Sequence, residues 1–504
     1  MRGPRLGSCA PPLLALAAGT LVLTACGTRL NDADFVQAQR QQQGLAPVPG
    51  ATAGAGVPGG DSGIGPSAGP GAPGGGAQGG DVGPGPGAQR SSGPGGGAAA
   101  NTASDVGVTP TTITIGNIVS KTNPFDQRAF VGPGYGIQAF VHWVNAHGGI
   151  NGRQVILKTC DDQGSGNANV SCVHQLIDSD HVFALVSNAI LTYSGADYVN
   201  SKGVPDMGAQ PIDNAYAKYP HLYDIYGEYY PRDGKQVGFD GKLYGGTEVY
   251  KYFSQRFPHV RKVAGVVEYN QSASQRFGDS IVNGLEHEGY TVDKKVVNFA
   301  LPDYDSVAID FRNKGVQFIY DVIDRAGNVR LCKALDDNNV DFTAKVLTPQ
   351  SWEQSIGDEY RDSPNCRRKT WATGMTLNYA DTQYPQVKAF REQMSADGHG
   401  GADQLSEWAL EGWAGGVWFA DAAGSCGADL TRRCFEAFVN SGKPYDAHGL
   451  LVPRLFEERS TPEPQSRNCI NVAQWSDSAG TWVTRVPDMN KNCFTVHELP
   501  YPAG

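Results

Sequence analysis

Apolar and polar positions along residues 111–210 follow two alternating periods, which predict strands and helices in turn. Residues 112–116 are a β-branched run that stops at a glycine, as strands commonly do. Residues 137–144 place apolar side chains at helical spacing on one face. Residues 154–159 predict a second strand, and after another helical pattern the apolar residues 182–186 predict a third, buried one. This order of elements predicts a doubly wound α/β lobe.

A similar alternation returns later in the chain and predicts a second α/β lobe. Strands are expected at residues 262–268, 291–299, 318–322 and 345–347, and helices at 277–287 and 329–335. Before them, the tyrosine-rich residues 223–230 and the charged, glycine-rich sequence up to Gly246 predict a surface loop. About 400 residues in all are too many for one hydrophobic core. The predicted fold class is α/β with two Rossmann-like lobes.

The first 26 residues have the features of a targeting segment. Arg2 and Arg5 precede an apolar core at residues 13–23, which is too short to span a membrane. Small residues then lead to Cys26, as in bacterial lipoprotein signals. We expect a product that starts at Cys26, carries lipid on that thiol and uses the lipid as its only membrane anchor. An ordinary signal peptide with a chance cysteine is the alternative.

Residues 27–105 are expected to form a disordered tether. From residue 44 onward this segment is dominated by glycine, proline and alanine, with scarcely a large apolar side chain. Such a composition cannot bury enough surface to offset chain entropy. A flexible chain of about 75 residues spans roughly 50 Å root-mean-square, enough to hold a domain clear of a membrane.

Charge and cysteine content indicate in which compartment the protein resides and which classes of partner it can bind. The net charge of −10 argues against nucleic acid as a partner. Eight cysteines follow Cys26, with no CxxC pair and no histidine at metal-ligand spacing, so no metal is expected. In an exported protein they predict disulfides, with buried free thiols as the alternative. Their spacing suggests the pairs Cys160–Cys172, Cys332–Cys366, Cys426–Cys434 and Cys469–Cys493.

Three stretches of the chain resemble a known family. They are VNAHGGINGRQVIL, DDQGSGNANVSCVHQLIDSDHVFALVS and YVNSKGVPDM, in which helix, double glycine, Asn-Gly turn and strand follow at characteristic spacing. The chain resembles the extracellular substrate-binding proteins of ABC importers, specifically the branched-chain amino-acid binding family (periplasmic binding protein type I). The resemblance extends more loosely over residues 106–504.

The resemblance implies a two-lobed clamp with a hinge. Residues 106–230 with 348–435 would form the first lobe, and residues 231–347 with 436–504 the second. The protein would be a lipid-anchored monomer on the extracytoplasmic face of the cell membrane. It would capture a small polar solute, such as an amino acid or related compound, and deliver it to an ABC permease.

Ligands of open α/β sheets bind beyond the carboxyl ends of the strands. Applied to the resembling family, this rule gives these candidate contacts: Ser187, Asn188, Ala189, Thr192, Gln210, Pro211, Tyr269, Asn270, Ser272 and Asp324. Capping or simple exposure is the competing interpretation for each of them. Ala189 stands where the family usually has a serine, and Ile212 where it has a threonine. The family's acid falls near Gly327, with Asp324 the nearest carboxylate. These departures argue against a standard branched-chain amino acid.

Enzyme chemistry has no motif in this sequence. There is no HExxH, GxSxG or P-loop, and no cofactor is expected. Asp161 and Asp162 are adjacent acids ahead of a helix, where capping is the usual role. Two other functions stay open: a ligand sensor of the same fold that signals to a membrane receptor, and a surface structural lipoprotein without a ligand. The misfits at Ala189 and Ile212 motivate the second.

Overall fold

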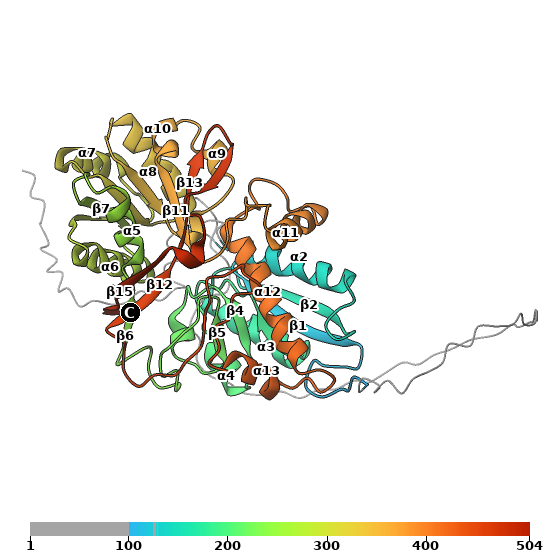
Figure 1. Cartoon of the computed structure of the whole chain (residues 1–504). Helices are drawn as coiled ribbons and strands as arrows, with labels where there is room; N and C mark the ends of the chain where they lie inside the picture. Colours follow the sequence, from blue (N-terminus) through green and yellow to red (C-terminus); the bar gives the residue numbers. More distant parts are fainter. Residues whose placement is uncertain (1–99, 124–127, 129, 504) are drawn as a thin grey trace, which may run out of the picture. The chain divides into compact units, whose positions relative to one another are not determined.

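The computed structural model describes residues 100–123, 128 and 130–503, and most of the strands in these residues form two sheets (Figure 1). The first sheet has the order β2-β1-β3-β4-β5 with every pairing parallel. Its strands are β1 Thr112–Val119, β2 Gln154–Asp161, β3 Ala184–Val186, β4 Asp206–Ala209 and β5 Leu222–Asp224. A parallel sheet needs crossover helices, as the alternating sequence pattern predicted.

Helices from two distant stretches of the chain cover this first sheet. They are α2 Gly132–Ala146, α3 Gly166–His174 with the π-helical turn Gln175–Ser179, α4 Ala196–Ser201, α11 Pro385–Ala396, α12 Glu407–Ser425 and α13 Arg432–Val439. Figure 1 shows α12 alongside the sheet, where it packs on α2 and β4. Ser406 caps α12 by accepting a hydrogen bond from the Ala409 amide at 3.1 Å. Trp413 and Trp418 of α12 are fully buried.

Glycines allow α12 to lie unusually close to its neighbours. A Cβ at Gly136 of α2 would collide with the Ala409 carbonyl oxygen of α12. A Cβ at Gly412 would lie 2.6 Å from the Pro133 Cα, so the two helix backbones touch. Residues 132–136 therefore form the first turn of α2, and Gly132 and Gly136 serve helix packing.

The second sheet has the order β14-β13-β11-β10-β9-β7-β8. Its parallel strands are β7 Val263–Tyr269, β8 Thr291–Val297, β9 Phe318–Val322, β10 Ala344–Leu347 and β11 Thr370–Gly374, and the antiparallel hairpin β13 Asn471–Ser476 and β14 Thr481–Thr484 extends one edge. The helices are α5 Glu248–Arg256, α6 Ser272–His287, α7 Tyr304–Lys314, α8 Arg325–Asp337, α9 Ile356–Glu359 and α10 Pro364–Arg368, with 3-10 turns at Pro349–Ser351 and Met489–Lys491, whereas the 3-10 turn Asn214–Ala217 lies between β4 and β5 in the first lobe. Two α/β lobes with parallel sheets confirm the predicted fold class.

One predicted boundary between the lobes needs correction. Strand β11 was expected in the first lobe because it follows residue 347, yet it pairs with β10 through Val346 and Trp371 in the second sheet. All five residues of β11 are buried there. The remaining boundaries stay predictions.

Two short ribbons lie outside the main sheets. β6 Lys242–Gly245 pairs with β16 Leu499–Pro502, and β12 Gln465–Cys469 pairs with β15 Cys493–His497. The first pair is here called the β6–β16 ribbon. Its strand β6 lies within the stretch up to Gly246 that was predicted to be a surface loop. That prediction missed a strand because its partner lies more than two hundred residues away in the sequence.

Three segments that pass between the lobes run side by side. The Leu377 amide donates to the Leu450 carbonyl at 2.8 Å, and the Val452 amide donates to the Met375 carbonyl at 2.7 Å. The Glu457 amide donates to the Glu228 carbonyl at 3.0 Å. These crossing segments are the natural place for a hinge.

Four disulfides join the cysteines in the predicted pairs: Cys160–Cys172, Cys332–Cys366, Cys426–Cys434 and Cys469–Cys493. The predicted signal segment, Cys26 and the tether up to residue 99 lie outside the described residues. The end of the predicted tether is docked instead of free. Ser104 donates to the Leu430 carbonyl at 2.6 Å, and Asp105 accepts from the Arg432 amide at 2.7 Å.

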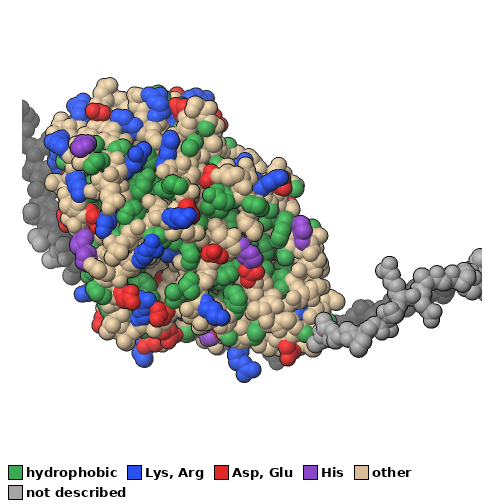
Figure 2. Space-filling model, viewed as in Figure 1, with side chains coloured by type: hydrophobic (Ala, Val, Ile, Leu, Met, Phe, Trp, Pro, Cys, Tyr) green, Lys and Arg blue, Asp and Glu red, His purple; other side chains and the backbone are tan. Residues whose placement is uncertain are grey.

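The surface of the described chain is mixed in character. On the face shown in Figure 2, acidic and basic side chains are intermingled with apolar ones. Within residues 100–123, 128 and 130–503, no helix combines the length and apolar character that crossing a membrane requires.

Candidate ligand-binding cleft

The loop after β3 carries three predicted contacts, and all three are fully buried. Ser187 has a left-handed backbone with φ 54°, and its hydroxyl donates to the Gly412 carbonyl of α12 at 2.9 Å. The Asn188 side chain accepts from the Ile118 amide at 2.7 Å. Ala189 uses its amide and carbonyl to bind the strand end at Ile118 and Ser120. These residues hold the loop to the lobe and do not present side chains to a cleft.

The loop after β4 leads to a buried acidic pair on α12. The Gln210 side-chain amide donates through Nε2 to Glu411 Oε2 at 2.6 Å, and the Tyr226 hydroxyl donates to Glu411 Oε1 at 3.0 Å. Burial raises the pKa of Glu411 to about 8. Burial and the neighbouring Glu411 also raise the pKa of Glu407, one helical turn earlier. Glu407 and Glu411 lie four residues apart on a mostly apolar helix, a pattern that can be recognised in the sequence. They were nevertheless not among the predicted site residues.

The remaining first-lobe candidates lie nearer the surface. Thr192 and Pro211 are half-buried, beyond the ends of β3 and β4. Tyr193, next to Thr192, is buried, and its hydroxyl donates to Asp206 at 2.7 Å. Of the first-lobe candidates, Thr192 and Pro211 are therefore the two whose position suits contact with a solute.

The second lobe brings two predicted contacts together at the carboxyl ends of β7 and β9. The Tyr269 hydroxyl donates to Asp324 Oδ1 at 2.8 Å and lies 3.1 Å from the Tyr304 hydroxyl. Asp324 also caps α8 by accepting from the Gly327 amide at 2.6 Å. Burial and the Asp324 carboxylate raise the pKa of Tyr269, so the phenol stays protonated. The ring of Phe299 stands edge-on to Tyr269, with centroids 4.9 Å apart.

Asn270 and Ser272, the other second-lobe candidates, are exposed. The Asn270 side chain accepts from the Phe299 amide at 2.9 Å and so orders the loop after β8. Ser272 begins α6.

Charged side chains join the two lobes at this edge. Arg128 of the first lobe lies 3.1 Å from Glu359 in α9 of the second. Arg325, at the start of α8, pairs with the same Glu359 at 3.2 Å and with Glu353 at 3.2 Å. On another part of the same edge, Arg276 of α6 donates to the Ile212 carbonyl in the loop after β4 at 3.1 Å.

A small cavity of about 190 Å³ opens beyond the carboxyl end of β1. It is lined by two cations, Lys121 and Arg128, by the Asp403 carboxylate, and by the polar or aromatic Thr122, Tyr135 and Gln404. Charges of both signs within one small cavity can match a solute that carries both. None of the predicted contact residues lines this cavity.

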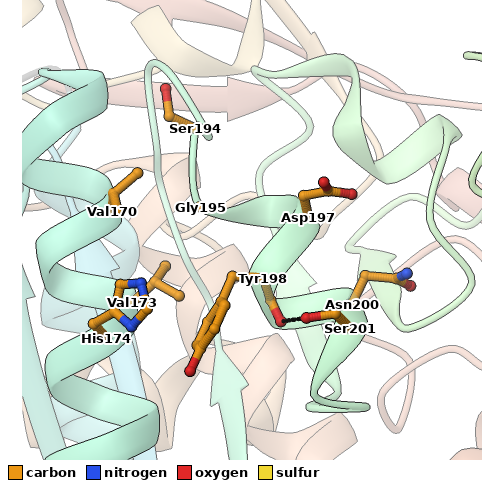
Figure 3. A pocket seen from close by; sticks show the side chains of 9 residues that line it. All are labelled: Val170, Val173, His174, Ser194, Gly195, Asp197, Tyr198, Asn200 and Ser201. Carbon is orange, nitrogen blue, oxygen red and sulfur yellow. Dashed lines mark hydrogen bonds between the residues drawn. The ribbon is translucent and has the colours of Figure 1, made fainter.

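A second, shallower cavity of about 330 Å³ lies between α3 and α4 in the outer helical layer (Figure 3). His174 and Tyr198 lie against each other there with ring centroids 4.1 Å apart, and both bind Asp178. Ser201 donates to the Tyr198 carbonyl at 2.8 Å, the contact drawn in Figure 3. These side chains satisfy one another, and no predicted contact lines this cavity.

The described part of the chain contains no cluster of three or more His, Cys, Asp or Glu side chains arranged to hold a metal ion. Asp161 and Asp162 act locally, as a pair of loop-ordering acids. Asp161 accepts from Thr122 at 2.7 Å, and Asp162 accepts from Ser120 at 2.7 Å and from Asn169 at 3.0 Å.

Comparisons with known proteins find a matching family model and several similar solved structures. A family model described as periplasmic binding protein matches residues 112–481. A fatty acid ABC transporter substrate-binding protein from Thermomonospora curvata is similar, with 14% identity, a TM-score of 0.58, and 77% of this chain and 94% of that chain covered. A leucine binding protein, LivK, from Thermotoga maritima is similar at 11% identity and a TM-score of 0.57, covering 74% and 98% of the two chains.

The branched-chain amino acid transporter substrate binding protein LivJ from Streptococcus pneumoniae, solved in complex with isoleucine, is also similar. Its identity is 14% and its TM-score 0.54, with 74% of this chain and 100% of that chain covered. At these identities the structural matches establish the fold alone. A search of curated protein sequences finds no match.

Proposed function

Because this chain belongs to the periplasmic binding protein family, we propose that it captures a small polar solute between its lobes and delivers it to an ABC importer. Proteins of this family bind small solutes outside the cytoplasm and work with transporter permeases, and they are not enzymes. The coupling to a permease and the class of solute are our proposal for this chain.

One observation carries the proposal: polar loops at the carboxyl ends of both parallel sheets are joined across the lobes. Arg128 and Arg276 make these cross-lobe contacts, and three crossing segments supply the hinge. A solute would bind one lobe first, and closure would add the contacts of the other lobe. Closure favours the solute only as far as the closed form binds it more tightly than the open form.

The solute we propose carries both an anionic and a cationic group, as an amino acid or related compound does. The cavity beyond β1 supports this choice because Lys121 and Arg128 suit an anion and Asp403 suits a cation. On the second lobe, Tyr269 and Asp324 would add polar and aromatic contacts.

The proposed setting is the extracytoplasmic face of the cell membrane. Lipid on Cys26 would anchor the protein, and residues 27–99 would serve as a tether that lets the lobes reach a permease. The net charge of −10 supports a small solute instead of nucleic acid as the ligand. We propose a monomer because a clamp of this kind needs one chain only.

A thermal-shift screen of the whole purified chain under oxidising conditions tests the proposal. The panel holds amino acids, amides, urea, short peptides, aromatic acids and sugars. A solute at one hundred times its dissociation constant should add about 2.7 kcal/mol of stability, a shift of several degrees. Zwitterionic amino acids should score above their amides, which keep the cationic amino group but lack the carboxylate. A flat response from folded, monodisperse protein would contradict the proposal.

The burial of predicted contacts favours one alternative, a surface lipoprotein that keeps the fold without a ligand. The polar side chains of three predicted contacts make hydrogen bonds inside the first lobe: Ser187, Asn188 and Gln210. A sensor of the same fold would still respond in the screen, and the flat result alone would favour the structural role. Co-purification with a permease separates an importer component from a sensor.

A further inference from the structure

The β6–β16 ribbon is attached to the second lobe through α6. Tyr501 of the ribbon pairs with Leu243, and the Asn283 side chain of α6 donates to the Pro500 carbonyl at 3.3 Å. Figure 1 shows β6 beneath α6. The ribbon should therefore move with the second lobe.

The same ribbon also reaches the first lobe. The Asn214 side chain, just beyond the loop after β4, donates to the Ala503 carbonyl at 2.7 Å. The Gly238 amide donates to the Ala217 carbonyl at 3.0 Å. An apolar cluster seals the contact, with these members all buried: Ala217, Tyr230, Phe239, Leu243 and Ala503.

Arg276 ties these parts together. One guanidinium nitrogen donates to the Ile212 carbonyl at 3.1 Å, and another donates to the Ala503 carbonyl at 3.3 Å. Ile212 belongs to the loop after β4, where the resembling family places a ligand contact. A single side chain of α6 thus binds the first lobe and the end of the ribbon at the edge of the cleft.

We propose that Arg276 and the β6–β16 ribbon form a latch that holds the lobes together, with Arg276 as a positioning residue for solute retention. The latch rests on the proposed function only in that a solute would occupy the cleft it closes. Opening must break the Asn214–Ala503 and Arg276–Ile212 hydrogen bonds. The latch should therefore slow solute release more than it alters solute entry.

Hydrogen exchange measured by mass spectrometry on the whole chain without solute tests the latch. Arg276→Gln is compared with wild type, with Arg276→Lys, and with the control Arg312→Gln. Arg312 also donates to a backbone carbonyl, that of Asn338 at 3.1 Å, but within the second lobe. In Arg276→Gln, exchange should rise about threefold or more in two cleft segments, residues 130–135 and 356–361, because the neighbouring Arg128–Glu359 contact between the lobes breaks each time the cleft opens. Arg276→Lys should recover part of the protection, and the control should match wild type.

Two results would overturn the latch. One is unchanged exchange in both cleft segments. The other is faster exchange confined to residues 210–218 and 499–503, which would mean that Arg276 only packs its own surroundings. The measurement needs no solute, so a failed solute screen leaves it interpretable. With a solute in hand, Arg276→Gln should raise the dissociation rate about tenfold and change the association rate far less.

Discussion

The most informative residues are polar side chains that the fold has turned inward. Ser187 shows why: its left-handed backbone directs the hydroxyl to the Gly412 carbonyl instead of the cleft. Glu411 receives hydrogen bonds from Gln210 and Tyr226 in the same layer between the sheet edge and α12. A polar group that is buried and satisfied supports the fold, and removing its partner is costly.

Ser187→Ala should therefore affect stability and not solute binding. Loss of the hydrogen bond to Gly412 should lower the unfolding free energy by about 1 kcal/mol. The dissociation constant for the solute should change less than about twofold. The contrasting variant is Thr192→Val at the half-buried loop edge, which should weaken binding with little loss of stability. Denaturant unfolding and calorimetric titration give both quantities, and a loss of affinity in Ser187→Ala would refute this assignment.

Glu411 should make stability depend on pH. Its folded-state pKa of about 8 lies above the ordinary value of 4.5. Between these values the folded protein holds a proton that the unfolded chain releases, so stability is full below about pH 4.5 and falls as the pH rises towards 8. We expect Glu411 to cause a fall of roughly 3 kcal/mol between pH 5 and pH 8, and Glu411→Gln should remove most of it. Urea unfolding at several pH values measures it.

The exposed Glu392→Gln is the matched control, and it should keep the wild-type pH profile. A Glu411→Gln profile identical to wild type would show that the carboxyl is ionised in the folded protein.

The resemblance to the family predicted which loops border the cleft but not the direction of their side chains. Ser187, Asn188 and Gln210 were predicted to contact a solute, but their side chains are buried inside the first lobe and do not face the cleft. Tyr269 and Asp324 were placed together because each follows a parallel strand of one sheet. Arg276 was missed because its partners, Ile212 and Ala503, become neighbours only in the folded chain.

At the scale of elements, contact between α2 and α12 determines the first lobe. Gly136 and Gly412 let the helix backbones meet without intervening side chains. The hydrophobic pattern predicted α2, since periodicity is a local property of the sequence. It could not assign β11 to its sheet or pair β6 with β16, because strand neighbours depend on contacts distant in the chain.

Gly136→Ala should be strongly destabilising. The added methyl would collide with the Ala409 carbonyl oxygen and lie 2.7 Å from the Trp413 amide nitrogen, both backbone atoms. Overpacking of this kind costs about 1–3 kcal/mol, and rigid neighbours place this site at the upper end. Gly424→Ala, at the far end of α12, is the control.

At Gly424 the nearest atom is the Ile150 Cγ2, 4.0 Å from the added Cβ. Its replacement by alanine should raise stability by about 0.5–1 kcal/mol through helix propensity alone. Thermal unfolding compares the two variants, and a Gly136→Ala protein as stable as wild type would mean that the helices are farther apart.

At the scale of the whole molecule, four disulfides reinforce two lobes that share a hinge. Cys332 and Cys366 are fully buried between α8 and α10, whereas Cys469 and Cys493 are half-exposed in the β12–β15 ribbon. A crosslink stabilises mainly by restricting the unfolded chain, by about 2–4 kcal/mol for loops of this size.

Reduction should follow this difference in exposure. In mild thiol reductant at neutral pH, the Cys469–Cys493 bond should open first and the Cys332–Cys366 bond last, because attack requires access to a sulfur. Alkylation followed by peptide mass spectrometry gives the order. In denaturant the order should disappear, and its persistence there would show that access does not govern it.

The placement of α12 also dictates an order of assembly. The helix that fills the core of the first lobe begins roughly 180 residues after β5, the last strand of its sheet. A chain that emerges from its amino end must finish most of the second lobe's sheet before the first can bury its apolar face. Until then the first lobe's sheet lacks the helix that packs on β4 and α2, so the lobe cannot complete its core for most of synthesis. In the proposed export of this chain through a membrane, that delay would be useful, because only an unfolded chain can pass.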